Sequence, residues 1–459
     1  MSYDYDVAVI GAGPGGYVTA IKAAQMGKKT CIIEKEYLGG TCLNVGCIPT
    51  KTLIKTANLL KELREASSFA IEGVDALKLS VSMPKLQARK KAVVSKLVGG
   101  VKGLLRANKA DVIEGAASFV DAHTLQIGGK RVSAEYVIIA TGSKAVIPSF
   151  IPLEGKNNLL TSTEALNLDS APASIAIVGG GVIGVEFAYL LNLLGSKVTV
   201  VELLDHILPM VDKEVSALAQ KRMAKDGITF RLGAKVLRVK DNAVFYEIGG
   251  KEESVCADAV LMAVGRAPNT EGLGAEAAGV KFEKNAVQVD ERMRTNVENI
   301  YAIGDVNGKV MLAHTASHEG LAALSAIYGG HETVNYERIP SCIYTDPEIA
   351  CIGLTEEQAK QRSGNVKVGK FPMAANGKSL VEGDTDGLFK VIVDGAHGEI
   401  LGVHLYGKHV TDMISEIAVA MTAEATVEEL LNAVHPHPTV SEALPEAFMA
   451  AGGRAIHSL

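Results

Sequence analysis

The chain has 459 residues, of which 47% are hydrophobic and 21% charged, and a net charge of −6. This length exceeds what one hydrophobic core supports, so we predict a globular protein of two to four domains. The acidic balance and the lack of a contiguous basic block argue against nucleic-acid binding. Six cysteines in this length do not form the framework of a small secreted protein, so we expect a reducing compartment, the cytoplasm.

Targeting and metal signals are weak. The chain enters a strand pattern at once with YDYDVAVIG, so we expect no signal or transit peptide. The apolar run 175–195 has the length of a membrane span, but glycines interrupt it and it contains Glu186. We therefore predict a strand, a turn and a helix there. No group of His, Cys and Asp has zinc spacing, and we predict no metal.

The first element is a dinucleotide fingerprint. It comprises a strand over 5–10, a helix over 17–26 and, between them, Gly11, Gly13 and Gly16 in G-x-G-x-x-G spacing. A second strand over 30–33 ends at Glu34, 23 residues after Gly11. The glycines allow a pyrophosphate to approach the helix N-terminus, and the acid can bind a ribose. This context predicts a dinucleotide-binding fold.

Cys42 and Cys47 follow in GGTCLNVGCIPTK, ahead of helix-forming sequence over 52–63. We predict that both lie on the first turns of one helix, where residues five apart point about 140° away from each other. A disulfide needs converging Cβ vectors, which bending at Gly46 and Pro49 would permit. A helix N-terminus also favours a thiolate. The pair fits a disulfide that cycles in catalysis, or equally two inert buried cysteines.

Paired strands are predicted over 123–140, just before Thr141, Gly142 and Ser143. Proline and polar residues over 148–158 then indicate a crossover into another domain.

The fingerprint then repeats, with strands over 174–178 and 197–201, a helix over 185–194, and glycines Gly179, Gly181 and Gly184. Glu202 again follows the first glycine by 23 residues. The duplication predicts two nucleotide-binding domains. A carboxylate at the ribose repels a 2′-phosphate, and no Lys or Arg follows until Lys213, which favours NAD over NADP.

A strand over 259–264 leads to Gly265, and a later one, NIYAIGD, delivers Gly304 and Asp305 to its carboxyl end. Ligands bind at such ends in open α/β sheets. On these grounds Asp305 is either a ligand contact or a turn former.

From about residue 340 the pattern becomes mixed α+β, with strands over 388–393 and 400–405 and a helix over 412–422. No glycine fingerprint occurs there. We expect this region to supply an oligomer interface.

A histidine motif, HPHPTVSE, lies near the C-terminus. A disulfide cycle needs a base because the thiolate attacks sulfur, and either His435 or His437 has a suitable pKa. Glu442 could orient that histidine. However, Thr439 and Glu442 also fit a capping box, and the residues alone favour that structural role. Lys51 is similarly either an anion or cofactor contact or a solvated lysine.

Over essentially the whole chain, the motifs occur in an order that resembles the pyridine nucleotide–disulfide oxidoreductases. They are GAGPGG, GGTCLNVGCIPTK, ATGS, GGGVIGVE, AVGRAPN, IYAIGD and HPHPTVSE. Within that family they are most similar to members that oxidise dihydrolipoamide with NAD. The resemblance implies a homodimer. Its partner would be the lipoyl-bearing acyltransferase of a 2-oxo acid dehydrogenase complex or the glycine-cleavage H protein.

The implied fold class is α/β, with two Rossmann-like domains for FAD and NAD and an α+β C-terminal dimerisation domain. The expected segments are the first part of the FAD domain at 1–148, the NAD domain at 149–269, the FAD return segment at 270–340 and the interface domain at 341–459.

The resemblance also implies site residues. FAD would contact Gly11, Gly13, Gly16, Glu34, Lys51, Thr141, Gly142, Gly304, Asp305 and Ala313. NAD would contact Gly179, Gly181, Gly184, Glu186, Glu202 and Gly265, with Lys51 and Glu186 paired near the flavin and nicotinamide.

The implied catalytic residues are two thiols, a base and its partner. Cys42 would be the interchange thiol that faces the substrate, and Cys47 the thiol beside the flavin. His437 would be the base, supplied by the second subunit, with Glu442 as its partner. For Glu442 the resemblance thus favours a catalytic role, whereas the residues alone favour a capping role.

Other family members fit less well. Glutathione reductase and its kin share the cysteine motif but use NADP, against which Glu202 argues. No cysteine follows Cys351, which disfavours mercuric reductase and the large thioredoxin reductases. A flavin-binding subunit without turnover is the remaining alternative, and the intact cysteines and His437 argue against it.

Overall fold

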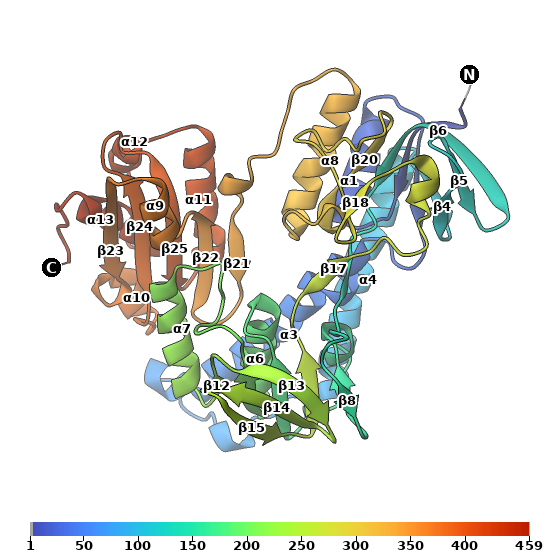
Figure 1. Ribbon diagram of the computed structural model, residues 1–459. Helices are drawn as coiled ribbons and strands as arrows, with labels where there is room; N and C mark the ends of the chain where they lie inside the picture. Colours follow the sequence, from blue (N-terminus) through green and yellow to red (C-terminus); the bar gives the residue numbers. More distant parts are fainter. Residues whose placement is uncertain (1–2, 459) are drawn as a thin grey trace.

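The first sheet is built around β1 (Tyr5–Ile10), whose last four residues are buried. It pairs in parallel with β2 (Thr30–Glu34) and β6 (Lys130–Ile139), and β20 (Ile300–Ala302) returns from far along the chain to join β6. Continuous apolar runs in these strands reflect a sheet that is covered on both faces. The computed structural model describes residues 3–458 and is shown in Figure 1.

The remaining elements of this region complete the sheet and cover it. They are β3 (Asp111–Glu114), β4 (Ala117–Phe119), β5 (Thr124–Ile127), α1 (Pro14–Gln25), α2 (Gly40–Val45), α3 (Cys47–Arg64), α4 (Met83–Ala107) and α8 (Ala313–Ile327).

A second parallel sheet repeats this plan around β10 (Ser174–Val178). Its other members are β9 (Leu159–Leu160), β11 (Lys197–Val201), β12 (Thr229–Arg231) and β16 (Ala259–Met262), with helices α5 (Ser162–Ala165), α6 (Val182–Leu193) and α7 (Lys213–Lys225). A smaller sheet comprises β8 (Leu153–Glu154), β13 (Lys235–Lys240), β14 (Ala243–Ile248) and β15 (Lys251–Cys256). The pair β7 (Ser143–Ala145) and β17 (Arg266–Pro268) connects this region to the first.

The third region is an antiparallel sheet with helices packed on it, seen in orange and red in Figure 1. Its strands are β21 (Ser341–Ile343), β22 (Glu348–Gly353), β23 (Val366–Pro372), β24 (Leu388–Asp394) and β25 (Ile400–Gly407). Its helices are α9 (Glu356–Arg362), α10 (Gly377–Val381), α11 (Val410–Thr422), α12 (Val427–Asn432) and α13 (Ala443–Ala451). This architecture confirms the predicted fold class, whereas the exact domain boundaries stay predictions.

Both fingerprint helices begin three residues earlier than the sequence predicted, at Pro14 and Val182. The preceding glycines, Gly13 and Gly181, are extended N-caps with ψ of −178° and −176°. Each helix therefore begins directly after the second glycine of its fingerprint. The apolar run 175–195 forms β10 and α6, as predicted, and no helix among residues 3–458 is long and apolar enough to cross a membrane.

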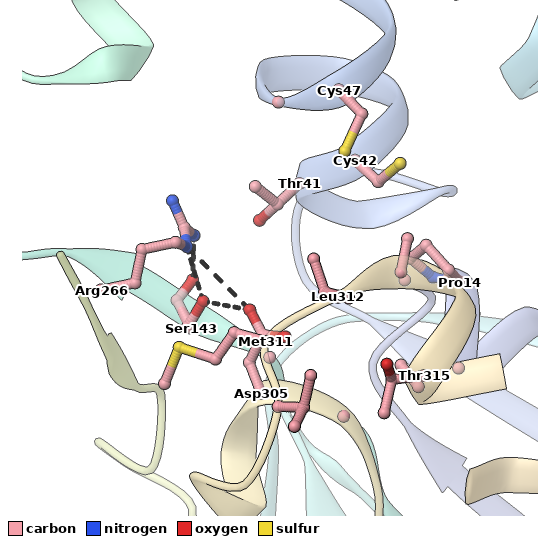
Figure 2. A pocket seen from close by; sticks show the side chains of 18 of the residues that line it. Pro14, Thr41, Cys42, Cys47, Ser143, Arg266, Asp305, Met311, Leu312 and Thr315 are labelled. Atoms are coloured by element: carbon pink, nitrogen blue, oxygen red, sulfur yellow. Dashed lines mark hydrogen bonds and ion pairs between the residues drawn. The ribbon is translucent and has the colours of Figure 1, made fainter. Parts of the chain in front are cut away.

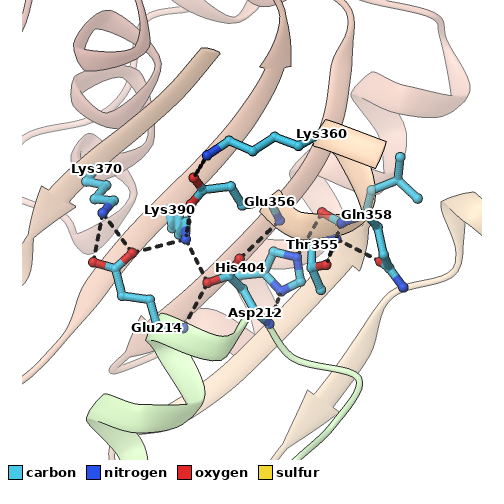
Figure 3. Close-up of polar contacts among 10 residues, drawn as sticks. Asp212, Glu214, Thr355, Glu356, Gln358, Lys360, Lys370, Lys390 and His404 are labelled. Atoms are coloured by element: carbon cyan, nitrogen blue, oxygen red, sulfur yellow. Dashed lines mark hydrogen bonds and ion pairs between the residues drawn. The ribbon is translucent and has the colours of Figure 1, made fainter. Parts of the chain in front are cut away.

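A buried lysine joins the second and third regions. Lys390 on β24 is 2% exposed, and its Nζ lies 2.8 Å from Asp212, 3.0 Å from Glu214 and 2.6 Å from Glu356 (Figure 3). Burial alone would lower the pKa of Lys390, but hydrogen bonds to the three carboxylates raise it above its usual value. Lys390 thus remains a cation that holds the start of α7 against the third sheet.

His404 on β25 completes this contact. Its Nδ1 accepts a hydrogen bond from the Asp212 backbone N–H at 3.1 Å, and its Nε2 donates to the Leu354 carbonyl at 3.0 Å. A backbone N–H can only donate, so His404 is the neutral tautomer with its hydrogen on Nε2. Burial lowers the pKa of His404, which keeps it neutral.

Replacing Lys390 with methionine tests this junction. The change leaves the three carboxylates without their shared cation, and we expect the free energy of unfolding to fall by about 3 kcal/mol. Denaturant unfolding at neutral pH measures the loss. Lys370→Met is the matched control because Lys370 pairs only with Glu214, at 2.8 Å, and is exposed. We expect that control to cost less than about 1 kcal/mol; equal losses would contradict the assignment.

Candidate functional site

The cysteine pair lies at a break between two helices, not on one helix as predicted. Cys42 lies in α2, Gly46 interrupts the backbone with φ −141° and ψ −116°, and Cys47 is the first residue of α3. A Cβ on Gly46 would lie 2.9 Å from the Thr41 carbonyl oxygen, closer than such contacts occur. Glycine therefore permits the break, which brings the Cys42 and Cys47 side chains next to each other (Figure 2).

The two thiols have different acidities. A hydrogen bond from Cys42 lowers the pKa of Cys47 to about 7; burial opposes this shift, and the Lys51 charge adds to it. The same hydrogen bond, together with burial, raises the pKa of Cys42 well above its usual value. In the reduced pair, therefore, Cys47 is the thiolate and Cys42 the thiol. A disulfide releases its more acidic thiol most readily, so this asymmetry makes Cys47 the leaving group.

An ion pair ties the cysteine helix to the second region. Lys51 Nζ lies 2.8 Å and 2.9 Å from the two carboxylate oxygens of Glu186, which is 4% exposed, as the resemblance implied. The Tyr344 backbone N–H donates to Glu186 at 3.1 Å, and the Lys51 ammonium lies 4.6 Å from the Tyr344 ring centroid. Residues from all three regions therefore meet one turn away from Cys47.

In both glycine turns, the first and second glycines have different surroundings. A Cβ on Gly11 or Gly179 would lie 2.3 Å or 2.4 Å from a carbonyl oxygen of the neighbouring strand end, so these glycines permit a close approach. A Cβ on Gly13 or Gly181 would meet nothing within 4 Å. The second glycine of each turn thus faces open space at a helix N-terminus, where a pyrophosphate fits.

Gly184 lies apart from the other predicted cofactor residues. It is buried in α6, where a Cβ would lie 2.0 Å from the Gly179 carbonyl oxygen, and it does not line the cavity. It permits close helix–strand packing, and its predicted contact with NAD stays a prediction.

The acidic residues at the ends of the fingerprints accept hydrogen bonds from backbone N–H groups. Glu34 accepts from the Ala12 N–H at 2.7 Å, and Glu202 accepts from the N–H groups of Gly180 and, at 2.8 Å, Leu204. Each carboxylate therefore lies against its own glycine turn, where a dinucleotide ribose would be expected.

One cavity of about 3040 Å³ connects these parts. Pockets for single ligands usually measure about 300–1,000 Å³, so this cavity has room for two dinucleotides. Gly184 aside, every predicted cofactor residue lines it, together with both cysteines: Gly11, Gly13, Gly16, Glu34, Cys42, Cys47, Lys51, Thr141, Gly142, Gly179, Gly181, Glu186, Glu202, Gly265, Gly304, Asp305 and Ala313. The lining fits FAD at the first turn and NAD at the second.

Arg266, a half-buried arginine that the sequence did not single out, lines this cavity. Arg266 donates from Nε to Ser143 Oγ and from Nη2 to the Ser143 carbonyl, both at 2.7 Å, and Ser143 in turn donates to Asp305 (Figure 2). This network explains Asp305 better than a turn-forming role alone. Arg266 and Ser143 belong to the motifs AVGRAPN and ATGS, and this membership was the only feature of the sequence that could have pointed to them.

The histidine motif lies outside the cavity, in the third region. Nδ1 of His437 is 2.8 Å from Glu442 Oε1, while Glu442 Oε2 accepts the Thr439 N–H at 2.7 Å. Glu442 thus performs both roles that the sequence left open. The His437 side chain is 80% exposed, and its Nε2 has no partner within residues 3–458.

His435 has a different environment. Its side chain is 10% exposed, with Nε2 at 2.8 Å from Glu416 and Nδ1 at 3.2 Å from the Ala433 carbonyl. Because both ring nitrogens are engaged, His435 is the poorer candidate for a base.

The hydrogen bond between the two thiols can be tested in the reduced protein. We expect Cys42→Ala to raise the pKa of Cys47 from about 7 toward an ordinary thiol value of about 8.5, because the largest stabilisation of the thiolate is lost. The pH dependence of alkylation at Cys47 measures the shift. Cys342→Ala is the control, since this half-buried cysteine lines the same cavity. An unchanged midpoint in Cys42→Ala would refute the hydrogen-bonded pair.

Similar proteins match the chain over its whole length. A dihydrolipoyl dehydrogenase of Bacillus subtilis is 44% identical and covers 100% of both chains. A dihydrolipoyl dehydrogenase of Geobacillus stearothermophilus is 41% identical over 100% of this chain and 98% of its own. The solved structure of the flavoprotein disulfide reductase RclA from Escherichia coli, in a Cu(II) complex, is 30% identical, with a TM-score of 0.86 over 98% of this chain and 99% of that chain.

Family models agree with these similarities. Residues 5–320 match the pyridine nucleotide-disulphide oxidoreductase model, and residues 339–448 match the dimerisation domain of the same family. Together they account for all three regions of the fold. The chain belongs to the pyridine nucleotide-disulphide oxidoreductase family.

Proposed function

We propose that the chain is an NAD-dependent, FAD-containing dihydrolipoyl dehydrogenase, which oxidises dihydrolipoamide to lipoamide. The observation that carries the proposal is the cysteine pair, with one acidic and one non-acidic thiol, in a cavity shared by two dinucleotide turns. Similarity to dihydrolipoyl dehydrogenases at 41–44% identity supports the substrate class.

In the proposed cycle, His437 of a second copy takes a proton from one substrate thiol. The resulting thiolate attacks the Cys42 sulfur of the Cys42–Cys47 disulfide, and Cys47 leaves as a thiolate. His437 then gives its proton to the Cys42 sulfur and takes up the proton of the second substrate thiol. The resulting thiolate attacks the substrate sulfur of the mixed disulfide, which releases lipoamide and leaves Cys42 as a thiol. When bound, FAD supplies a two-electron acceptor beside Cys47 and NAD the final hydride acceptor.

Individual residues support these steps. Lys51 keeps a positive charge near the Cys47 thiolate and lowers its pKa. Burial would raise the pKa of Glu442, but the Thr439 N–H and His437 hold it below its usual value. Glu442 is therefore an anion that can orient the His437 ring and stabilise its protonated form. The exposed Nε2 of His437 is free to reach a second copy.

Cofactor choice follows from Glu202, whose carboxylate lies at the second glycine turn. We propose NAD because that negative charge disfavours a 2′-phosphate. We also propose that the chain forms a homodimer in the cytoplasm. Its dithiol would come from a lipoyl-bearing acyltransferase or from glycine-cleavage H protein.

The proposed reaction is tested with FAD-loaded protein. We expect NADH from dihydrolipoamide and NAD, little turnover with NADP, and none with glutathione disulfide and NADPH. Anaerobic dihydrolipoamide should also produce a long-wavelength thiolate–flavin absorption band in the wild type but not in Cys47→Ser. Loss of both signals in wild-type protein that retains FAD would favour a non-catalytic flavin-binding subunit. Turnover with glutathione disulfide would favour a glutathione reductase.

The choice of base is tested by His437→Ala. We expect kcat with free dihydrolipoamide to fall about 100-fold or more, because a general base contributes 10²–10⁴-fold. His435→Ala is the matched control and should keep most of its activity, although it loses the contact with Glu416. If the two variants lose activity equally, His437 is not singled out as the base.

A further inference from the structure

Helix α4 carries a one-sided positive charge that the proposed catalytic cycle does not use. Its 25 residues contain seven Lys or Arg and no Asp or Glu, in a chain whose net charge is −6. One of them, Lys90, is buried and donates to the Leu166 carbonyl at 2.6 Å. The other six are exposed: Lys85, Arg89, Lys91, Lys96, Lys102 and Arg106.

These six cations share one face of the helix. At about 100° per residue they fall within an arc of about 160°, and they extend over about 30 Å of helix axis. The opposite face carries the buried residues Leu86, Val101 and Leu105. A contiguous strip of charge therefore faces away from the core.

The strip has no acidic partner among the residues that the structure describes. None of the six forms an ion pair in residues 3–458. Like charges four apart on a helix cost about 0.2–0.5 kcal/mol per pair, and a cation in the first turn opposes the helix dipole. The arrangement is thus unfavourable in the isolated chain, and an acidic surface would relieve it.

The strip is also close to the redox site. α4 packs against α2 and α3, and Val98, Val101 and Leu105 belong to the same core cluster as Cys42 and Ile48. The cations therefore lie on the helix that supports the cysteine turn.

We propose that the cationic face of α4 docks an acidic protein domain that carries the dithiol substrate. This inference rests on the proposed function, because it names how the substrate of that site is delivered. Charges of one sign along a face raise the association rate of an oppositely charged partner by about 10–10³-fold, an effect that salt screens. A small uncharged dithiol would gain nothing from the strip.

The test compares two triple variants of the FAD-loaded protein. The α4 variant reverses charge on the helix with Lys91→Glu, Lys96→Glu and Lys102→Glu. The control variant changes the net charge equally at exposed lysines elsewhere that form no ion pair within residues 3–458, with Lys130→Glu, Lys221→Glu and Lys251→Glu. The probes are a lipoylated domain of net negative charge and free dihydrolipoamide. For the reduced domain at low salt, we expect kcat/KM to fall about tenfold or more in the α4 variant and less than about twofold in the control. Free dihydrolipoamide should be oxidised equally by all three proteins, and high salt should remove the difference.

Binding of the oxidised, unreactive domain separates docking from turnover. We expect the α4 variant to bind it about tenfold or more weakly than the control does. Equal binding by both variants overturns the docking proposal, even if dihydrolipoamide is oxidised. Weaker self-association of the α4 variant also overturns it, because the face would then meet a second copy. Failure of the wild type to oxidise free dihydrolipoamide, with domain binding intact, overturns the proposed function but supports docking.

Discussion

The helix break at Gly46 is the constraint on which the redox site depends. On a continuous helix, residues five apart would point about 140° away from each other, and the two thiols could not meet. The break ends α2 after Cys42 and starts α3 at Cys47, so one thiol can donate its hydrogen to the other. The contact between the thiols, burial and the Lys51 charge together separate the acidities of two otherwise similar groups. This difference makes Cys47 the leaving group when the disulfide is attacked.

The rest of the fold brings electron acceptors to this pair. The first sheet is completed by β20, which returns only after the whole second region, and thereby places Asp305 at the same edge as the first glycine turn. The second glycine turn opens into the same cavity. Lys51 and Glu186 hold the cysteine helix against the second region. The insertion of one nucleotide-binding fold into another therefore places two dinucleotide sites around one dithiol.

The third region carries His437, which we propose as the base for a second copy of the chain. Glu442 shows that structural and chemical roles need not compete, because its two oxygens serve the Thr439 cap and the His437 ring separately. Lys390 and His404 fasten this region to the start of α7, only ten residues after Glu202. The position of the dimerisation domain is thus connected to the loop that leaves the second fingerprint.

By itself the sequence determined the strands, both glycine turns, the acids that close them and the cysteine pair, because these depend on spacing along one segment. The family motifs added Lys51 with Glu186 and His437 with Glu442. Only the tertiary structure decided how the partners of each side chain are arranged. It separated Cys42 and Cys47 into two helices, turned Gly184 into the interior, and occupied both nitrogens of His435.

It also joined Arg266 to Ser143 and Asp305, and it left the cationic face of α4 exposed. The sequence shows no contiguous basic block because these charges are spaced along the chain by helical periodicity. The physical reason is the same in each case. Acidity, ion pairing and exposure depend on neighbours in space, and most of those neighbours lie far away in the sequence.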